Sequence, residues 1–488
     1  MTKNLKKILI MLSIPLIIVV LVAIAGIYKF NYLASKEGYD ADGNKIHSVV
    51  PVDLDYSGEF SKQDSDRFVT LLTSQDGEEI ASTLENIENN WHPIYIPMTL
   101  EVIHFVSPSI SFQLEEILIQ NTGQNFGSDN NAWYQWLWNQ PEQFVANYDN
   151  FKAEFYKLID TRFETYFKDR GETALVRLDE IRWGGVQQDG IPPLRNPEMI
   201  TVAEADYLDD DNVVFGIEVN GDVRAYPKRI LAWHELFTDT VGGVDVAGVY
   251  CTLCGTVILY ESEVDGVKHD LGTSGFLYRS NKLMYDAATQ SLWNTIRGEP
   301  VVGPLADKGI ALTHQSVVTT TWGEWKKLHP DTKVLSLNTG HNRNYDEGFA
   351  YNEYFSSDRL MFNTPFNDTS LKNKDEVLAL RFPAHPNDQL AISTDFLNDN
   401  PIYVDSVGDQ QFIVLTDHTG ANRVYNLPDG ITFESYADSK VTDSTGSVWD
   451  VSEPQLTADD GRVLERLPYH RSFWFGWHAT YPESRLVQ

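Results

Sequence analysis

Two cysteines, the only ones in the chain, stand three residues apart in Cys251-Thr252-Leu253-Cys254. Sulfurs at this spacing can either oxidise to a disulfide or hold one soft metal ion. There is no second pair of thiols to complete a four-cysteine zinc site, so any metal needs further ligands from elsewhere in the chain. The pair is therefore compatible with a metal site, a redox-active dithiol or a structural disulfide.

Two residues outside the motif could complete a metal site. His234 precedes the cysteines, within an expected short helix, and Met284 follows them. Two thiolates with an imidazole and a thioether suit Cu(I), because soft sulfur ligands select it, and suit zinc less well. The sequence thus predicts Cu(I) binding or delivery through Cys251, Cys254, His234 and Met284. His269 is a lesser candidate, because it lies beside an expected hairpin turn.

Each of these residues also has a structural interpretation. Nearby cysteines commonly form a disulfide in an oxidising compartment. His234, next to apolar residues, also fits a core histidine bonded to a backbone carbonyl. A thioredoxin-like site is disfavoured, since that motif opens a helix, whereas the residues after Cys254 read as a strand. The alternatives to metal binding are thiol–disulfide exchange and a non-catalytic module that binds carbohydrate or a protein partner.

Polar residues around Met284 are candidates for a pocket near the thiols. A classical serine hydrolase is not expected, because Gly272-Thr273-Ser274-Gly275 lacks the Gly-x-Ser-x-Gly pattern of a nucleophile elbow. The sequence leaves open whether the protein is an enzyme, and it allows thiol redox chemistry. The candidate pocket residues are Ser274, Tyr278, Arg279, Tyr285 and Asp286.

The part of the chain that holds these residues repeats itself. Two tryptophans and a proline recur at a constant offset: Trp322, Trp325 and Pro330 in the first copy, Trp474, Trp477 and Pro482 in the second. Where the first copy has the cysteine motif, the second reads Thr416-Asp417-His418-Thr419-Gly420. The paired thiols therefore mark a specialised site of the first copy.

Hairpin and helix signals predict an α+β fold. An Asn220-Gly221 turn between two runs of β-forming residues predicts a hairpin. Residues 61–169 instead place apolar residues at helical spacing. We therefore expect a small all-helical domain, similar to the ends of helical-repeat proteins, followed by a duplicated β-rich module with short helices.

The N-terminus predicts a membrane anchor. Three lysines precede an uncharged apolar run from Ile8 to Tyr28, close to the ~20 residues that cross a bilayer. Basic residues ahead of such a run favour a cytoplasmic N-terminus. A cleaved export signal is the alternative, because Ala23-Ile24-Ala25 has the small-residue spacing of a cleavage site. The expected location is the inner membrane, single-pass, with most of the chain outside the cytoplasm.

These features divide the chain into six segments. They are a cytoplasmic tip and transmembrane anchor (1–31), a linker (32–60), a helical domain (61–180), the first β-rich copy (181–335), a long connecting loop (336–375) and the second copy (376–488). The formal net charge of −32 argues against nucleic acid as a partner. The expected partners are the membrane, through the N-terminal helix, and a protein that handles metal or thiols.

Several runs, taken in order, resemble a prokaryotic family catalogued as domain of unknown function 3179, over about residues 189–487. They are Arg224-Ala225-Tyr226-Pro227, Trp233-His234-Glu235, Tyr250 to Gly255, Ser274 to Tyr278, Met284-Tyr285-Asp286, Ser291-Leu292-Trp293 and Trp322-Gly323-Glu324-Trp325. The resemblance implies an exported or membrane-anchored protein in which His234, Cys251, Cys254 and Met284 are motif residues. It brings no settled activity, and it does not extend to the helical segment before residue 189.

Overall fold

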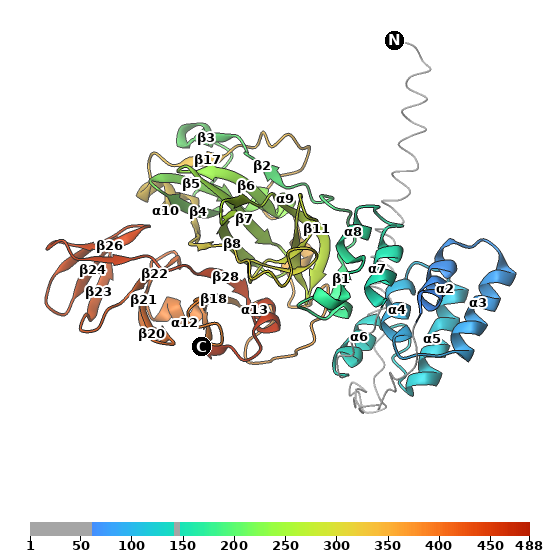
Figure 1. Ribbon diagram of the computed structural model, residues 1–488. Coiled ribbons are helices and arrows are strands. Elements are labelled where there is room, and N and C mark those ends of the chain that lie inside the picture. The colour runs from blue at the N-terminus through green and yellow to red at the C-terminus, as the bar shows by residue number, and fades with distance from the viewer. Residues whose placement is uncertain (1–60, 141–146) are drawn as a thin grey trace, which may run out of the picture. The chain divides into compact units, whose positions relative to one another are not determined.

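The computed structural model describes residues 61–140 and 147–488, and the chain divides into two compact units, Met1–Val145 and Ala146–Gln488. Figure 1 shows the helices of the first unit in blue and cyan and the strands of the second in green to red. The helical segment predicted over 61–180 is thus shared between the two units.

Five helices form the described part of the first unit. They are α2 (Lys62–Thr73), α3 (Gly77–Asn89), α4 (Tyr95–Val102), α5 (Pro108–Thr122) and α6 (Asn130–Trp138). Helices α3 and α6 begin after capping residues, because Asp76 and Asp129 accept hydrogen bonds from the first turns of these helices. The tryptophans of α6 pack in the core with residues of α4 and α5, among them Leu100 and Leu118.

The second unit begins with two short helices, α7 (Tyr148–Tyr156) and α8 (Phe163–Phe167). Their aromatic side chains surround Phe276 of strand β11, with ring centroids 4.8 Å away for Tyr156 and for Phe163. This burial of large apolar rings against a strand explains why α7 and α8 belong to the β-rich unit and not with α2–α6.

One large sheet joins the two copies of the module. Its strands, in order, are β2 (Leu194–Arg195), β6 (Leu236–Val241), β7 (Val244–Cys251), β8 (Thr256–Glu261), β28 (His470–Phe473), β18 (Glu376–Arg381), β19 (Gln389–Ser393) and β29 (Arg485–Val487), with β15 (His314–Gln315) also on β8. The copies meet where β28 pairs with β8, and Arg471 stands opposite Val257 (Figure 1).

The first copy builds a second sheet in the order β16 (Val318–Thr321), β4 (Val213–Val219), β5 (Asp222–Pro227), β17 (Lys333–Leu335) and β3 (Met199–Thr201). Helix α9 (Lys228–His234) follows β5, and α10 (Trp322–Leu328) follows β16. In the second copy, α12 (Thr394–Asp399) follows β19 and α13 (Trp474–Thr480) follows β28.

The pairing of these strands repeats from copy to copy. Strand β16 lies antiparallel to β4 as β28 does to β18, and β17 lies parallel to β5 as β29 does to β19. The recurring tryptophans begin α10 and α13, where all four are buried. The sequence repeat therefore corresponds to two copies of one arrangement of elements.

Smaller elements complete both copies. The first contains the sheet β1 (Ile181–Trp183), β11 (Leu271–Tyr278), β12 (Asn281–Asp286), β13 (Leu292–Asn294) and β14 (Glu299–Val302), the hairpin β9 (Glu263–Val264) and β10 (Val267–Lys268), and the 3-10 turn η3 (Val202–Glu204). Two further 3-10 turns, η1 (Gly171–Thr173) and η2 (Leu178–Glu180), precede it. The second contains β20 (Ile402–Val407), β21 (Gln410–Thr416) and β22 (Asn422–Asn426), and β23 (Phe433–Ala437), β24 (Lys440–Asp443), β25 (Val448–Val451), β26 (Gln455–Ala458) and β27 (Val463–Glu465). Helix α11 (Asn352–Phe355) lies in the loop between the copies.

The predicted membrane anchor requires a correction. None of the helices within residues 61–140 and 147–488 combines the length and the apolar composition needed to cross a membrane. The predicted anchor, residues 8–28, lies outside the described residues. The fold class is therefore a helical unit and a duplicated β-rich unit, without the predicted transmembrane helix among the described residues. The predicted single-pass location in the inner membrane is corrected with it.

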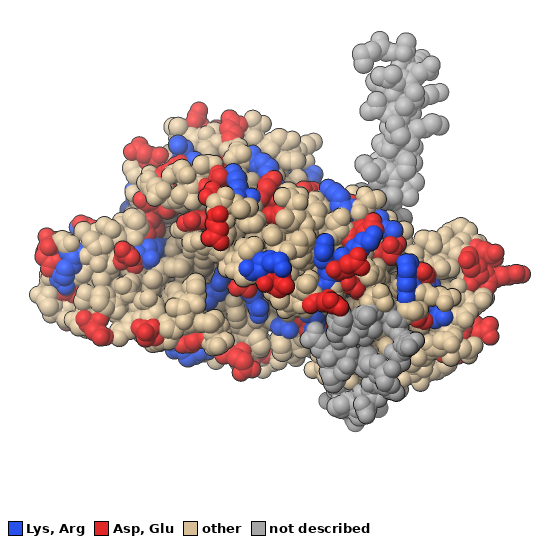
Figure 2. All heavy atoms as spheres, viewed as in Figure 1, with Lys and Arg blue, Asp and Glu red and all other residues tan. Residues whose placement is uncertain are grey.

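Charged side chains are distributed over both units. On the face shown in Figure 2, red carboxylates and blue basic side chains are interspersed over the described residues. Mixed charges of this kind keep a protein surface solvated.

Candidate functional site

The two cysteines form a disulfide across the turn between β7 and β8. Cys251 is the last residue of β7 and pairs with Thr256, the first residue of β8. Its Cα lies 5.6 Å from that of Cys254, and the two residues are only 2% and 0% exposed. Gly255 turns the chain with a φ of +62°, and a Cβ there would come within 2.7 Å of the Phe473 ring. The position therefore requires glycine, both for its backbone and for space.

The second copy supplies one wall of this site. The backbone N–H of Phe473 on β28 donates to the carbonyl oxygen of Cys254 at 2.8 Å. A Cβ on Gly476 of α13 would lie 2.8 Å from the Cβ of Cys254. Sγ of Cys254 lies 3.2 Å from Oγ1 of Thr256, and since a disulfide sulfur carries no proton, the hydroxyl is the donor.

A buried ion pair lies next to the disulfide loop. Oγ1 of Thr252 donates to Oε1 of Glu235 at 2.5 Å, and the Tyr351 hydroxyl donates to the same oxygen at 3.0 Å. Nζ of Lys282, on β12, lies 2.7 Å from Oε2 of Glu235. Burial lowers the pKa of Lys282, and the Glu235 carboxylate opposes this effect. Glu235 thus links the disulfide loop, strand β12 and the loop that carries Tyr351.

The long loop between the copies covers the disulfide. The Tyr354 hydroxyl donates to the carbonyl oxygen of Leu253 at 2.7 Å. Tyr351, Phe355 and Phe362 of this loop pack against the apolar cluster that contains both cysteines. The segment 336–375 therefore closes the site from solvent.

His234 lies in a different environment from the one predicted for a metal ligand. Its Nδ1 donates to the carbonyl oxygen of Pro192 at 2.8 Å, and its Nε2 accepts from the Tyr345 hydroxyl at 2.6 Å. Burial lowers the pKa of His234 to about 4. Both ring nitrogens are thus occupied in a neutral imidazole, which matches the alternative of a core histidine.

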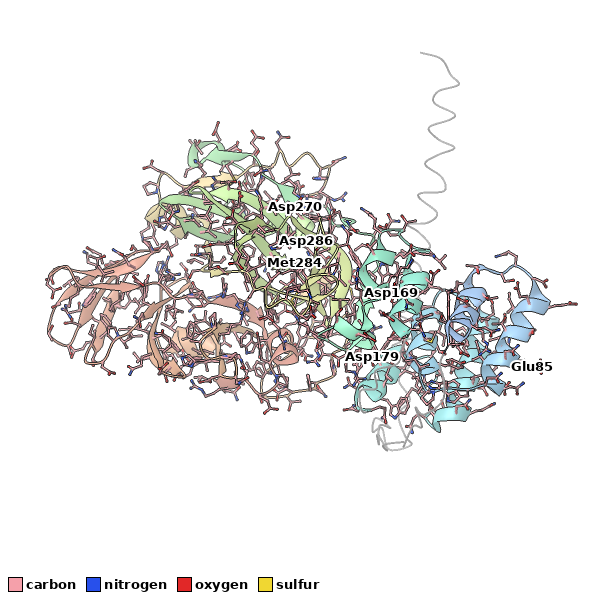
Figure 3. The ribbon with its side chains drawn as sticks, in the orientation of Figure 1. Glu85, Asp169, Asp179, Asp270, Met284 and Asp286 are labelled. Atoms are coloured by element: carbon pink, nitrogen blue, oxygen red, sulfur yellow. A yellow bond between two sulfur atoms is a disulfide. The ribbon has the colours of Figure 1, made fainter. Side chains whose placement is uncertain are left out.

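Met284 packs in another apolar cluster. It lies opposite Trp293 across β12 and β13, with Leu236 and Ile258 among its neighbours, whereas the cysteines belong to the cluster under the long loop. Met284 and Asp286 stand at nearby positions of β12 in Figure 3. The predicted Cu(I) ligands therefore do not converge.

This arrangement corrects the prediction of metal binding. Within residues 61–140 and 147–488, no three His, Cys, Asp or Glu side chains are grouped so that they could hold a metal ion. The physical reasons are that the two sulfurs are bonded to each other and that His234 uses both ring nitrogens elsewhere.

The five candidate pocket residues are engaged at several places, and only Tyr278 and Arg279 share a partner, Glu180. Oγ of Ser274 donates to the carbonyl oxygen of Leu283, the Tyr285 hydroxyl donates to Asp189, and Arg279 pairs with Glu180. Asp286 accepts from the turn that follows β12 and lies 2.8 Å from Nδ1 of His269. Burial raises the pKa of Tyr278. These contacts stabilise the meander of β11–β14, and they do not form one pocket at the thiols.

The second copy closes the matching turn without thiols. The backbone N–H of Tyr250 donates to the carbonyl of Glu235, and that of Thr416 donates to Pro401, both at 2.9 Å, so Pro401 stands in the place of Glu235. One residue further, Asp417 occupies the place of Cys251. Its Oδ1 accepts from the backbone of Thr419 at 2.9 Å and closes the turn. The disulfide is thus particular to the first copy, whereas an ion pair lies at this turn in both copies, since Arg423 pairs with Asp417 at 3.1 Å in the second.

Sequence reasoning missed Glu235, Lys282 and Tyr351 as parts of the site. Two signals could have found Glu235 and Lys282. Glu235 directly follows His234 in the motif that precedes the cysteines, and Lys282 is a lone charge ahead of the apolar residues Leu283 and Met284. A lysine buried in a strand requires a counter-charge, and the nearest motif acid was available.

Comparisons with known proteins identify a family and nothing closer. No curated protein and no solved structure matches the chain. The sequence model of the family described as Protein of unknown function (DUF3179) matches residues 188–484. This range begins at the segment leading into the duplicated module and ends next to β29. Since the match spans more than half of the chain, the protein belongs to the DUF3179 family.

Proposed function

We propose that the protein carries out thiol–disulfide exchange through Cys251 and Cys254. The observation that carries the proposal is the comparison between the copies, because the second copy closes the corresponding turn, which is one residue shorter, with backbone N–H groups that donate to Oδ1 of Asp417. The hairpin of the second copy thus needs no disulfide. The presence of the disulfide in the first copy alone favours a chemical role.

The small entropic effect of a short loop supports the same conclusion. In the chain-entropy description, a disulfide that closes a four-residue loop stabilises a fold by about 2 kcal/mol, less than one that closes a long loop. A disulfide at this position therefore adds little stability beyond what the hydrogen bonds to Asp417 provide at the turn of the second copy.

The geometry suggests which sulfur is attacked. A partner thiolate that attacks Sγ of Cys251 forms a mixed disulfide and releases Cys254 as the thiolate. The Thr256 hydroxyl, 3.2 Å from Sγ of Cys254, donates a hydrogen bond that stabilises this leaving group. A second thiolate of the partner then attacks the mixed disulfide at the partner's own sulfur. The partner leaves as a disulfide, and Cys251 and Cys254 remain as a dithiol that has gained two electrons and two protons.

The long loop controls access to this chemistry. Both sulfurs are buried beneath Tyr351 and Tyr354, whose hydroxyls bond to Glu235 and to Leu253. Exchange with a protein or small thiol therefore requires the loop to move. Such a movement breaks the two hydrogen bonds that the hydroxyls of Tyr351 and Tyr354 donate.

Trapping tests the proposal. Full-length protein with Cys254→Ser keeps Cys251 as a free thiol. Its thiolate should attack a disulfide probe such as oxidised glutathione, form a mixed disulfide at Cys251 and release the other half of the probe as a thiol. The mixed disulfide should be stable, because the variant has no second thiol to displace the probe. The matched variant Cys251→Ser should trap much less, because the Thr256 hydroxyl favours Cys254 as the leaving sulfur and not as the attacking one. Equal and negligible trapping by both folded variants would favour a structural disulfide in a non-catalytic module.

A further inference from the structure

A second cluster of polar side chains lies where the two copies share the large sheet, away from the disulfide. His314 on β15 and His470 on β28 have ring centroids 5.4 Å apart. All four ring nitrogens are buried, and within the described part of the chain neither nitrogen of His470 has a hydrogen-bond partner, whereas His314 interacts with the backbone of Tyr469. Buried polar groups of this kind are normally satisfied by protein, water or a ligand.

Two arginines border the same cluster. Nη2 of Arg381, on β18, donates to the Tyr260 hydroxyl at 3.0 Å, but its Nε is buried without a partner. Arg297, after β13, places its guanidinium 5.6 Å from the Tyr481 ring centroid, and its Nε is likewise unpartnered. Neither arginine forms an ion pair with a residue that the structure describes.

The cluster is connected through its aromatic rings. Tyr260 lies 5.7 Å from His314, Trp477 lies 5.5 Å from His470, and Trp477 lies 4.7 Å from Tyr481, between ring centroids. These rings join the histidines to both guanidinium groups. Arg297, Arg381, His314 and Tyr481 are partly exposed, whereas His470 is fully buried, so the cluster opens to solvent at the arginines.

The chemistry of the cluster is that of a site rich in donors and positive charge. Burial and the nearby Arg381 lower the pKa of His470 to about 3, and the same causes lower that of His314. Both imidazoles are therefore neutral at neutral pH, and His470 offers one N–H without a partner. Asn294 is joined to this region because its Oδ1 accepts from the backbone N–H of Arg297 at 3.0 Å, and its Nδ2 is a further buried donor without a partner.

The charge of the cluster decides whether water or an anion is the better occupant. Water could satisfy the imidazoles, but it cannot neutralise two guanidinium groups in a partly buried site. The chain has a net charge of −32, yet no carboxylate of the described residues pairs with either arginine. Glu299 lies near enough for its charge to affect Arg381 but forms no ion pair with it.

We propose that this cluster binds a small oxyanion, with Arg381 and Arg297 supplying the charge and His470 and Asn294 supplying directed N–H donors. Arginine suits this role because its planar guanidinium presents paired donors to carboxylate or phosphate oxygens. The shared chemistry is a group with two or three anionic oxygens, carried either by a small organic carboxylate or by inorganic phosphate. The site is independent of the cysteines.

Calorimetric titration of the full-length protein with sodium phosphate and with sodium succinate, at constant ionic strength in chloride, tests the proposal. We expect saturable binding of at least one of the two anions, with one site per chain. Binding of phosphate alone or of succinate alone identifies the source of the oxyanion. Absence of saturable binding by both would overturn the proposal.

Variants locate the binding. Arg381→Gln should weaken the affinity at least tenfold, whereas Arg359→Gln, which removes the same charge from an exposed loop position, should leave it unchanged. If Arg381→Gln does not fold, Arg297→Gln serves as the second variant with the same expectation. An affinity that is unchanged in a folded Arg381 or Arg297 variant would show that the anion binds elsewhere and would overturn the assignment.

Discussion

Glu235 makes three contacts that tie the site together at the scale of single residues. Its carboxylate accepts from Thr252 and Tyr351 and pairs with Lys282. The residue adopts a left-handed backbone with a φ of +57°, a conformation that costs about 1 kcal/mol or more for a residue with a side chain. This left-handed residue ends helix α9 and turns the chain towards β6, which places its carboxylate beside Lys282.

Removing the carboxylate charge should destabilise the fold. In Glu235→Gln the Lys282 ammonium stays buried without a counter-charge, so the free energy of unfolding should fall by about 3–5 kcal/mol. Denaturant unfolding of the oxidised protein measures this. The control Glu263→Gln changes an exposed carboxylate on β9 and should shift stability by no more than about 0.5 kcal/mol. Similar values for the two variants would contradict the role given to Glu235.

His234 predicts a dependence of stability on pH. Its pKa falls from 6.5 to about 4 on folding, so between these values the unfolded chain binds a proton that the folded protein does not. The free energy of unfolding therefore decreases as pH falls through this window, by up to about 3 kcal/mol in total for this residue. His234→Gln should remove this part of the slope when unfolding midpoints are compared between pH 4 and 6.5. An unchanged slope would show that His234 titrates alike in both states.

At the scale of elements, the hairpin of β7 and β8 should fold without its thiols. The double variant Cys251→Ser, Cys254→Ser should keep the native circular dichroism spectrum and lose about 2 kcal/mol of stability, because the disulfide closes only a short loop. The second copy supplies the precedent, since Asp417 closes its turn by hydrogen bonds. Loss of folding in the double variant would mean that the disulfide is a required staple.

The loop over the disulfide should limit the rate of reduction. Tyr354→Phe removes the hydrogen bond to Leu253, worth about 1 kcal/mol, and should speed reduction by dithiothreitol about fivefold. The matched control Tyr403→Phe removes a hydroxyl that bonds to Asp405 in the second copy and should not change the rate. Equal rates in both variants and in the unchanged protein would show that reduction does not depend on movement of this loop.

Elements with local signals were predictable from sequence, and contacts between distant segments were not. The Asn220-Gly221 turn, between β4 and β5, follows from local turn chemistry. The ion pair between Glu235 and Lys282 joins a helix end to another strand, which no local pattern reveals. Helices α7 and α8 show the periodicity of the preceding helices, and their place beside Phe276 depends on tertiary packing.

At the scale of the whole molecule, the duplication explains both the fold and the location of the candidate site. Strand β28 and helix α13 of the second copy pack against the cysteine hairpin of the first, through Phe473 and Gly476. The site is therefore assembled from both copies. The sequence repeat was visible from the tryptophans and proline, but their packing partners required the pairing of β8 with β28.

The reduction potential of the Cys251–Cys254 pair tests the central claim most directly. Full-length protein is equilibrated in glutathione buffers of graded potential, the free thiols are alkylated and counted by mass spectrometry, and circular dichroism follows the fold. Thiol–disulfide exchange predicts reversible reduction of the folded protein with a potential between about −270 and −120 mV, the range of exchange proteins. A potential below about −300 mV, or reduction that occurs only together with unfolding, would contradict the proposal and identify the disulfide as structural.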